Sequence, residues 1–164
     1  MSYQLYASAA SLTPGSHVAM LLDPVADAIW CICAILRSGF VWVPVESRNY
    51  NAGVRAAVKE SRPQVLLYHN ATKTLAQVVI SGIGFTSILN INTCRSACLR
   101  ETVTDESSQD DIKSSDTTSS QPAMILYTSR STSVPKGVVL AHGDLLNQIF
   151  GTTTSLNLKR EKSL

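Results

Sequence analysis

Short apolar segments alternate with helix-like segments through residues 17–92, and this rhythm restricts the possible folds more than any other feature of the chain. The strand-like segments are 17–22, 40–45, 63–69 and 86–92, and the helix-like segments between them are 23–39, 51–62 and 71–81. Apolar strands separated by helices are typical of a parallel sheet that is covered on both faces. The sequence therefore predicts an α/β fold, a largely parallel sheet with flanking helices, which binds ligands at the carboxyl ends of its strands.

The first helix-like segment carries recognisable signals at both ends. Asp23 is a good N-cap residue, Pro24 fits the first turn, and Gly39 is a typical terminator. Between them, the apolar run Ala28–Leu36 is far shorter than the ~20 residues that cross a bilayer. The segment is therefore predicted to be a buried helix, and no membrane span is expected in the chain.

Charge and cysteine content exclude several classes of function. The formal net charge is +2, and the cationic residues are scattered rather than clustered on one face, so no nucleic-acid partner is expected. Cys31 and Cys33 lie in the apolar run AIWCICAIL, where thiols are usually small core residues, and Cys94 and Cys98 have no histidine nearby that would complete a zinc site. The N-terminus lacks the features of a signal peptide. These observations predict structural cysteines, no metal site and a cytoplasmic location.

A polar segment interrupts the apolar rhythm between residues 104 and 120. Ile112 is almost its only large apolar residue, which is too little to offset the entropic cost of ordering the segment. It is therefore predicted to be a flexible surface loop, in which Asp110 and Asp111 are solvated charges. The strand-like sequence PAMILYT resumes at Pro122, so the loop is expected to join two parts of one fold.

The segment LYTSRSTSVPKGVVLAH, residues 126–142, is the strongest candidate for a binding site. Five Ser/Thr hydroxyls, one arginine and one lysine lie between Thr128 and Lys136, after one strand and before a second short strand. Hydroxyls, backbone N–H groups and a lysine at a strand end can surround a phosphate. The segment differs from the GxxxxGK[ST] phosphate loop, which runs directly into a helix. A solvated polar turn without a ligand is the commoner alternative, and the residues alone leave both open.

Two segments resemble motifs of one enzyme family. ILYTSRSTSVPKGVVLAH resembles the phosphate-binding motif YTSGSTGxPKGV of the adenylate-forming, or AMP-binding, enzymes, and ILRSGFVWVPVES resembles their upstream motif LKAGxAYVPLD. The two motifs occur in the family's order, about 90 residues apart. Residues 1–155 are accordingly identified as part of an adenylation domain, an incomplete N-terminal subdomain of the adenylate-forming fold, with 156–164 as a tail outside the family. The residues of these two motifs most resemble those of nonribosomal peptide synthetases, particularly fungal polyketide–peptide hybrids.

The resemblance implies a reaction and its partners. In this family a carboxylate attacks the α-phosphorus of ATP, and the acyl group of the resulting adenylate then passes to the phosphopantetheine thiol of a carrier protein or to coenzyme A. The residues that match the family's contacts to the ATP phosphates are Thr128, Ser129, Ser131, Thr132 and Lys136, and Gly137 matches a position where the backbone turns closely. ATP and Mg²⁺ are the expected cofactors. No catalytic residue and no metal ligand of the family is matched within these 164 residues.

Two residues depart from the motif. Arg130 and Ser133 stand where the family has glycine, which permits tight backbone turns and close approach to phosphate. Serine is a mild change, whereas the Arg130 side chain would occupy the space that the phosphates approach. Arg130 is either an added phosphate contact or a sign of a damaged motif, and we favour damage.

The matched motifs leave several functions open. The chain is predicted to be a fragment of an acid-thiol ligase that activates a carboxylic, and more specifically an amino, acid and is inactive alone. The alternatives are a non-catalytic truncated remnant with at most weak nucleotide binding, or a fragment of an acyl-CoA synthetase. His142 follows the motif, and we expect it to open a helix rather than act as an acid or base.

Overall fold

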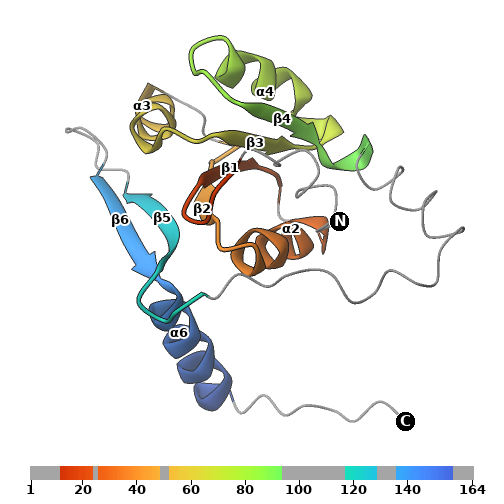
Figure 1. Cartoon of the computed structure of the whole chain (residues 1–164). Helices are drawn as coiled ribbons and strands as arrows, with labels where there is room; N and C mark the ends of the chain where they lie inside the picture. The colour runs from red at the N-terminus through yellow and green to blue at the C-terminus, as the bar shows by residue number, and fades with distance from the viewer. Residues whose placement is uncertain (1–11, 24–25, 49–51, 94–116, 129–135, 157–164) are drawn as a thin grey trace, which may run out of the picture.

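The structure is a computed structural model that describes residues 12–23, 26–48, 52–93, 117–128 and 136–156 (Figure 1). Its elements, in chain order, are β1 (His17–Leu21), α2 (Ala26–Arg37), β2 (Val41–Pro44), α3 (Ala52–Ser61), β3 (Val65–Tyr68), the short 3-10 helix η1 (Asn70–Thr72), α4 (Lys73–Ile80), β4 (Ser87–Asn90), β5 (Pro122–Thr128), β6 (Lys136–Ala141) and α6 (His142–Ser155). Each strand and helix expected from the sequence is present, with ends that differ by a few residues.

The six strands form one sheet in the order β4-β3-β1-β2-β5-β6. Strands β1 to β5 are parallel to their neighbours, and β6 alone runs antiparallel, next to β5. The predicted largely parallel α/β fold is confirmed. Strand β5, which follows the polar segment, pairs with β2 through Trp42 and Met124, so residues on both sides of that segment belong to one sheet.

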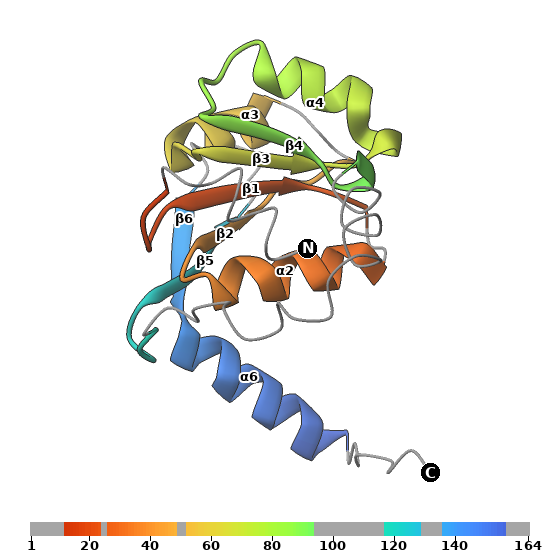
Figure 2. The same ribbon diagram turned by 45° about the vertical axis from the view of Figure 1, so that its right-hand side comes forward.

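The core lies on both faces of the sheet, because successive residues of a strand point to opposite sides. Val18 and Met20 of β1 pack with α2 on one face, whereas Ala19 and Leu21 pack with α3 and α4 on the other. Figures 1 and 2 both show α2 on one side of the sheet and α3 with α4 on the opposite side. This burial on both faces explains why the strands read as continuous apolar runs.

Helix α2 ends in the way that the sequence predicted. Gly39 has a φ of +72°, a left-handed conformation that glycine adopts without steric cost. The N–H of Phe40 donates to the carbonyl of Ile35 at 3.1 Å, and the N–H of Gly39 donates to that of Leu36 at 3.1 Å. This pair of bonds is a Schellman motif, which satisfies carbonyls at the helix end and aims the chain into β2. The segment Pro24–Val25, where the helix start was predicted, lies outside the described residues.

The prediction that the α2 segment is buried was only half right. Ala28, Cys31, Ala34 and Ile35 face the core, but Ile29 and Trp30 on the outer side are 64% and 66% exposed. Cys33 is also exposed, so the expectation of a core cysteine holds for Cys31 and is wrong for Cys33. A helix that packs on one face of a sheet buries only one stripe, and the unbroken apolar run concealed which stripe that is.

Apolar side chains are also exposed at the other end of the sheet. Helix α6 has no buried residue: Leu146, Ile149 and Phe150 within it are exposed, as is Leu156 directly after its end. Val138 and Val139 of β6 are 46% and 57% exposed. Figure 2 shows α6 extending away from the sheet. No helix within the described residues is long and apolar enough to cross a membrane.

Candidate functional site

Strands β5 and β6 form an antiparallel hairpin whose ends flank the predicted phosphate-binding segment. Thr128, the last residue of β5, lies opposite Lys136, the first residue of β6. The predicted site residues Ser129, Ser131 and Thr132 lie outside the described residues, as do Arg130 and Ser133. Because β5 is parallel to its neighbour β2, Thr128 lies at the edge of the sheet where the parallel strands have their carboxyl ends. This is the edge at which parallel sheets usually bind ligands.

Lys136 is exposed at the start of β6, and its ammonium group forms no ion pair with a described residue. A lysine in this state can bind an anion without first breaking another contact. The described part of the hairpin therefore presents a cation at the first position of β6, opposite the last residue of β5. Within the described residues, no group of three or more His, Cys, Asp or Glu side chains could hold a metal ion.

Gly137 lies inside β6, opposite Tyr127 of β5, rather than at the close turn that the sequence suggested. A Cβ atom on Gly137 would lie 3.1 Å from two carbon atoms of the Tyr127 ring and 3.3 Å from the Ile125 side chain. The missing side chain therefore makes room for the aromatic ring across the hairpin. Glycines on edge strands are often covered by a cross-strand aromatic residue in this way.

Tyr127 connects the hairpin to the C-terminal end of α3. Ser61 and Glu60, at the end of α3, lie close enough to influence the ionisation of its hydroxyl. Burial, and secondarily the negative charge of Glu60, raise the pKa of Tyr127, so the neutral phenol is the favoured form. The sequence reasoning did not assign this residue a role, although its place directly before the hydroxyl-rich segment was visible.

His142 begins α6, as the sequence predicted. The N–H of Ala141, the residue before it, donates to the Asp144 carboxylate at 2.8 Å, which satisfies one backbone donor at the helix start. The N–H of His142 donates to the Gln121 carbonyl at 3.0 Å and so ties α6 to the beginning of β5. Burial lowers the pKa of His142, and its buried Nε2 has no hydrogen-bond partner among the described residues.

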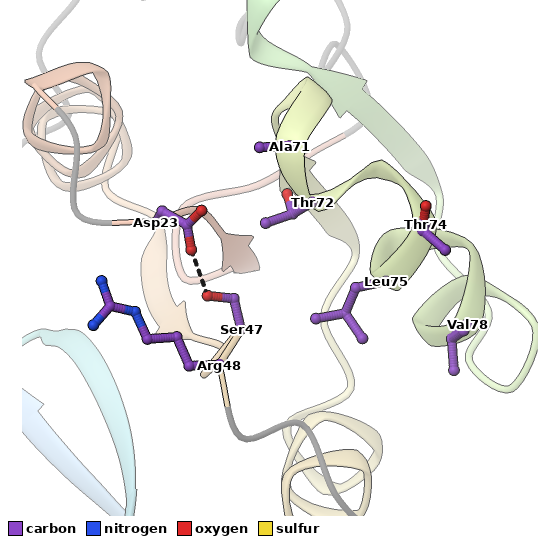
Figure 3. A pocket seen from close by; sticks show the side chains of 8 residues that line it. All are labelled: Asp23, Ser47, Arg48, Ala71, Thr72, Thr74, Leu75 and Val78. Carbon is purple, nitrogen blue, oxygen red and sulfur yellow. Dashed lines mark hydrogen bonds between the residues drawn. The ribbon is translucent and has the colours of Figure 1, made fainter.

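A second group of polar residues lies at the same edge of the sheet, beyond the ends of β1, β2 and β3. They surround a cavity of about 410 Å³. Figure 3 shows the side chains that line it: Asp23, Ser47, Arg48, Ala71, Thr72, Thr74, Leu75 and Val78. The loop after β1 continues toward β2, whereas the loop after β3 leads through η1 and α4 to β4 on the far side. Adjacent strands whose connections diverge leave a crevice at their carboxyl ends, which accounts for the position of the cavity.

A hydrogen-bond network joins the three strand ends below this cavity. The Ser47 hydroxyl donates to Asp23 Oδ1 at 2.7 Å, and Asp23 Oδ2 lies 3.6 Å from His69 Nε2. The Thr72 hydroxyl donates to the Leu21 carbonyl at 2.8 Å. From the sequence, Asp23 was predicted only to cap a helix, and His69 was given no role. The network depends on residues from three separate loops, so no local sequence pattern marks it.

Comparisons with known proteins identify the family and agree with the fold. Residues 6–163 match the family described as "AMP-binding enzyme". The chain is 32% identical over 152 residues to the PKS-NRPS hybrid synthetase psoA of Aspergillus fumigatus, and 33% identical over 159 residues to the hybrid PKS-NRPS synthetase iccA of Talaromyces variabilis. These matches cover 93% and 94% of this chain and 4% of each relative.

Solved structures reproduce the fold at low sequence identity. The crystal structure of VinN matches with a TM-score of 0.77 and 17% identity, over 98% of this chain and 39% of that one. The crystal structure of ATP-bound MatB from Rhodopseudomonas palustris matches with a TM-score of 0.72 and 19% identity, over 93% of this chain and 29% of that one. The chain thus spans less than half of each of these solved proteins and a small fraction of the curated relatives.

Proposed function

Because the chain belongs to the AMP-binding enzyme family, we propose that it is the ATP-phosphate-binding part of an adenylation domain that activates a carboxylic, specifically an amino, acid. In the complete reaction, a carboxylate oxygen attacks the α-phosphorus of ATP, the bond from that phosphorus to the bridging oxygen breaks, and pyrophosphate leaves. The acyl group then passes from the adenylate to the phosphopantetheine thiol of a carrier protein. We place this reaction in the cytoplasm.

The observation that carries the proposal is the register of the hairpin, in which Thr128 faces Lys136 at the carboxyl edge of a parallel sheet. Lys136 would place a positive charge beside the β- and γ-phosphates, while the hydroxyls of Thr128, Ser129, Ser131 and Thr132 would donate to phosphate oxygens. Mg²⁺ would supply further neutralisation of phosphate charge when bound. The amino-acid substrate and the carrier-protein thiol are supported by the hybrid synthetases that the chain resembles.

As a separate polypeptide of 164 residues, the chain is proposed to bind ATP without catalysing adenylation. Positioning of both reactants supplies much of the rate of such reactions. The solved relative VinN has more than twice the length that this chain matches, since the match covers 39% of it. A fragment of an acyl-CoA synthetase is the second candidate, and the solved structure described as a long-chain-fatty-acid CoA ligase of Rhodopseudomonas palustris, which is similar in fold with a TM-score of 0.71, keeps it open.

Isotope exchange between pyrophosphate and ATP, combined with calorimetric ATP titration, tests this proposal. The 164-residue chain is expected to show no exchange with any amino or aryl acid, and weak ATP binding. The double variant Arg130→Gly and Ser133→Gly restores the family's glycines and should tighten ATP binding without producing exchange. Weaker binding by the double variant would mean that Arg130 is a phosphate ligand and that the motif is intact. Carboxylate-dependent exchange by the unmodified chain would refute the assignment as a non-catalytic part.

A further inference from the structure

We propose that the cavity at the ends of β1, β2 and β3 is a second binding site, which takes a small zwitterion of the α-amino-acid type. None of the residues that line it belongs to the β5–β6 hairpin. The proposal therefore does not depend on ATP binding by the hairpin and goes beyond it.

The negative side of the cavity is a carboxylate held in a fixed position. Asp23 accepts a hydrogen bond from the Ser47 hydroxyl at 2.7 Å, and its other oxygen faces His69 Nε2 at 3.6 Å. The His69 ring is held in place on its other side, where Nδ1 lies 2.9 Å from the Thr72 hydroxyl oxygen and 3.2 Å from the Thr72 backbone nitrogen. The Asp23 side chain is still 38% exposed, which leaves it open to an ammonium group from the solvent.

The positive side is the guanidinium of Arg48, on the segment that follows β2. Arg48 is exposed, and its side chain forms no ion pair with a residue in the described part of the chain. Its backbone N–H donates to the Glu46 carboxylate at 3.1 Å, which fixes the local turn. A guanidinium can donate two parallel hydrogen bonds to one carboxylate, so Arg48 suits the acidic end of an amino acid.

The remaining wall of the cavity is mostly apolar. Figure 3 shows Leu75 and Val78, which belong to α4, across the cavity from Asp23, Ser47 and Arg48. Leu75 is half-buried, whereas Val78 is 48% exposed and would lose solvent contact beneath an aliphatic ligand side chain. The volume of about 410 Å³ lies in the range of ~300–1,000 Å³ that is typical of small-molecule sites.

The combination of charges selects the class of ligand. An organic cation alone would pair with Asp23 but be repelled by Arg48, and a carboxylate alone would pair with Arg48 but be repelled by Asp23. A neutral apolar molecule would remove both charges from water without giving either a partner. A zwitterion with an aliphatic side chain pairs both charges and covers the apolar wall, so L-leucine is a suitable probe.

Nuclear magnetic resonance titration of the ¹⁵N-labelled chain tests the proposal with three related probes. L-leucine carries both charged groups, 3-methylbutylamine lacks the carboxylate, and 4-methylpentanoate lacks the amine. L-leucine is expected to cause saturable shifts of the amide signals of Ser47, Thr74 and Leu75, with an affinity at least about tenfold higher than that of either analogue. Equal binding of one analogue, or no saturable shift at these amides with L-leucine, would overturn the proposal.

Three single variants separate the contributions of the two charges. Arg48→Gln and Asp23→Asn should each weaken L-leucine binding by about tenfold or more, while Lys59→Gln, which removes an exposed cation on α3, should leave it unchanged. Arg48 is exposed, so its replacement leaves the core intact and keeps the test decisive even if Asp23→Asn fails to fold. Undiminished binding by Arg48→Gln would overturn the assignment. ATP titration of the same variants distinguishes the cavity from the β5–β6 hairpin, because Arg48→Gln should bind ATP with the same affinity as the unmodified chain.

Discussion

Replacing Thr72 by valine tests whether the network at the carboxyl edge of the sheet stabilises the fold. Thr72 is 5% exposed, and its hydroxyl donates to the Leu21 carbonyl at 2.8 Å and accepts the N–H of His69 at 3.3 Å. Valine has nearly the same shape but removes these two hydrogen bonds, together with the 2.9 Å contact between the hydroxyl and His69 Nδ1. The two buried backbone groups lose a partner at roughly 1–3 kcal/mol each, so Thr72→Val should lower the free energy of unfolding by about 3 kcal/mol.

Thr72→Ser is the matched control, because it keeps the hydroxyl and removes only a methyl group. This should cost about 1 kcal/mol. The assay is equilibrium urea unfolding followed by tryptophan fluorescence, at low protein concentration to limit association through the exposed apolar side chains. With an m-value of about 2 kcal/mol/M, valine should lower the midpoint by about 1.5 M and serine by about 0.5 M. A valine variant as stable as the serine variant would refute the reasoning that the hydroxyl network stabilises the three strand ends.

Three further predictions follow from the hairpin and the exposed surfaces. Gly137→Ala places a Cβ atom 3.1 Å from the Tyr127 ring and should destabilise the chain by about 1 kcal/mol. Gly84→Ala should not destabilise it, because a Cβ atom there has nothing within 4 Å. Equal urea midpoints for the two variants would contradict the packing role of Gly137. Because burial lowers the pKa of His142, its contribution to stability is present above about pH 6.5 and is lost as the pH falls. Between pH 7.5 and pH 5.5, the free energy of unfolding should therefore decrease more for the unmodified chain than for His142→Gln. An equal decrease in the two proteins would contradict this role of His142. Because Trp30 and Phe150 are exposed, the chain should bind a hydrophobic fluorescent dye, and Phe150→Ser should bind less of it. A monodisperse monomer that binds no dye would refute this prediction.

The sequence predicted the sheet well because its signals are local. Gly39 marks the end of α2, since the left-handed conformation there is one that glycine adopts freely. The continuous apolar runs indicated strands buried on both faces, and that is how β1 and β3 pack. The order of the strands could not be read in the same way, because pairing between distant segments, such as β5 beside β2, depends on the whole fold.

The candidate sites were predictable to different degrees. The hairpin was found from one contiguous segment, so its strands and the helix start at His142 could be placed from the sequence. The role of Gly137 was misplaced, because the Tyr127 ring reaches it across the hairpin rather than along the chain. The cavity around Asp23 was missed, because Asp23 and Arg48 follow different strands and come to line one cavity only when β1 and β2 pair.

The central claim is that the β5–β6 hairpin binds the phosphates of ATP, and an ATP titration of the ¹⁵N-labelled chain in the presence of Mg²⁺ tests it most directly. We expect saturable shifts of the amide signals of Thr128, Lys136 and Gly137. The ATP affinity measured from these shifts should fall at least about tenfold in Lys136→Met and stay unchanged in Lys59→Gln. Shifts confined to other parts of the sheet, or binding that is indifferent to the loss of the Lys136 charge, would contradict it.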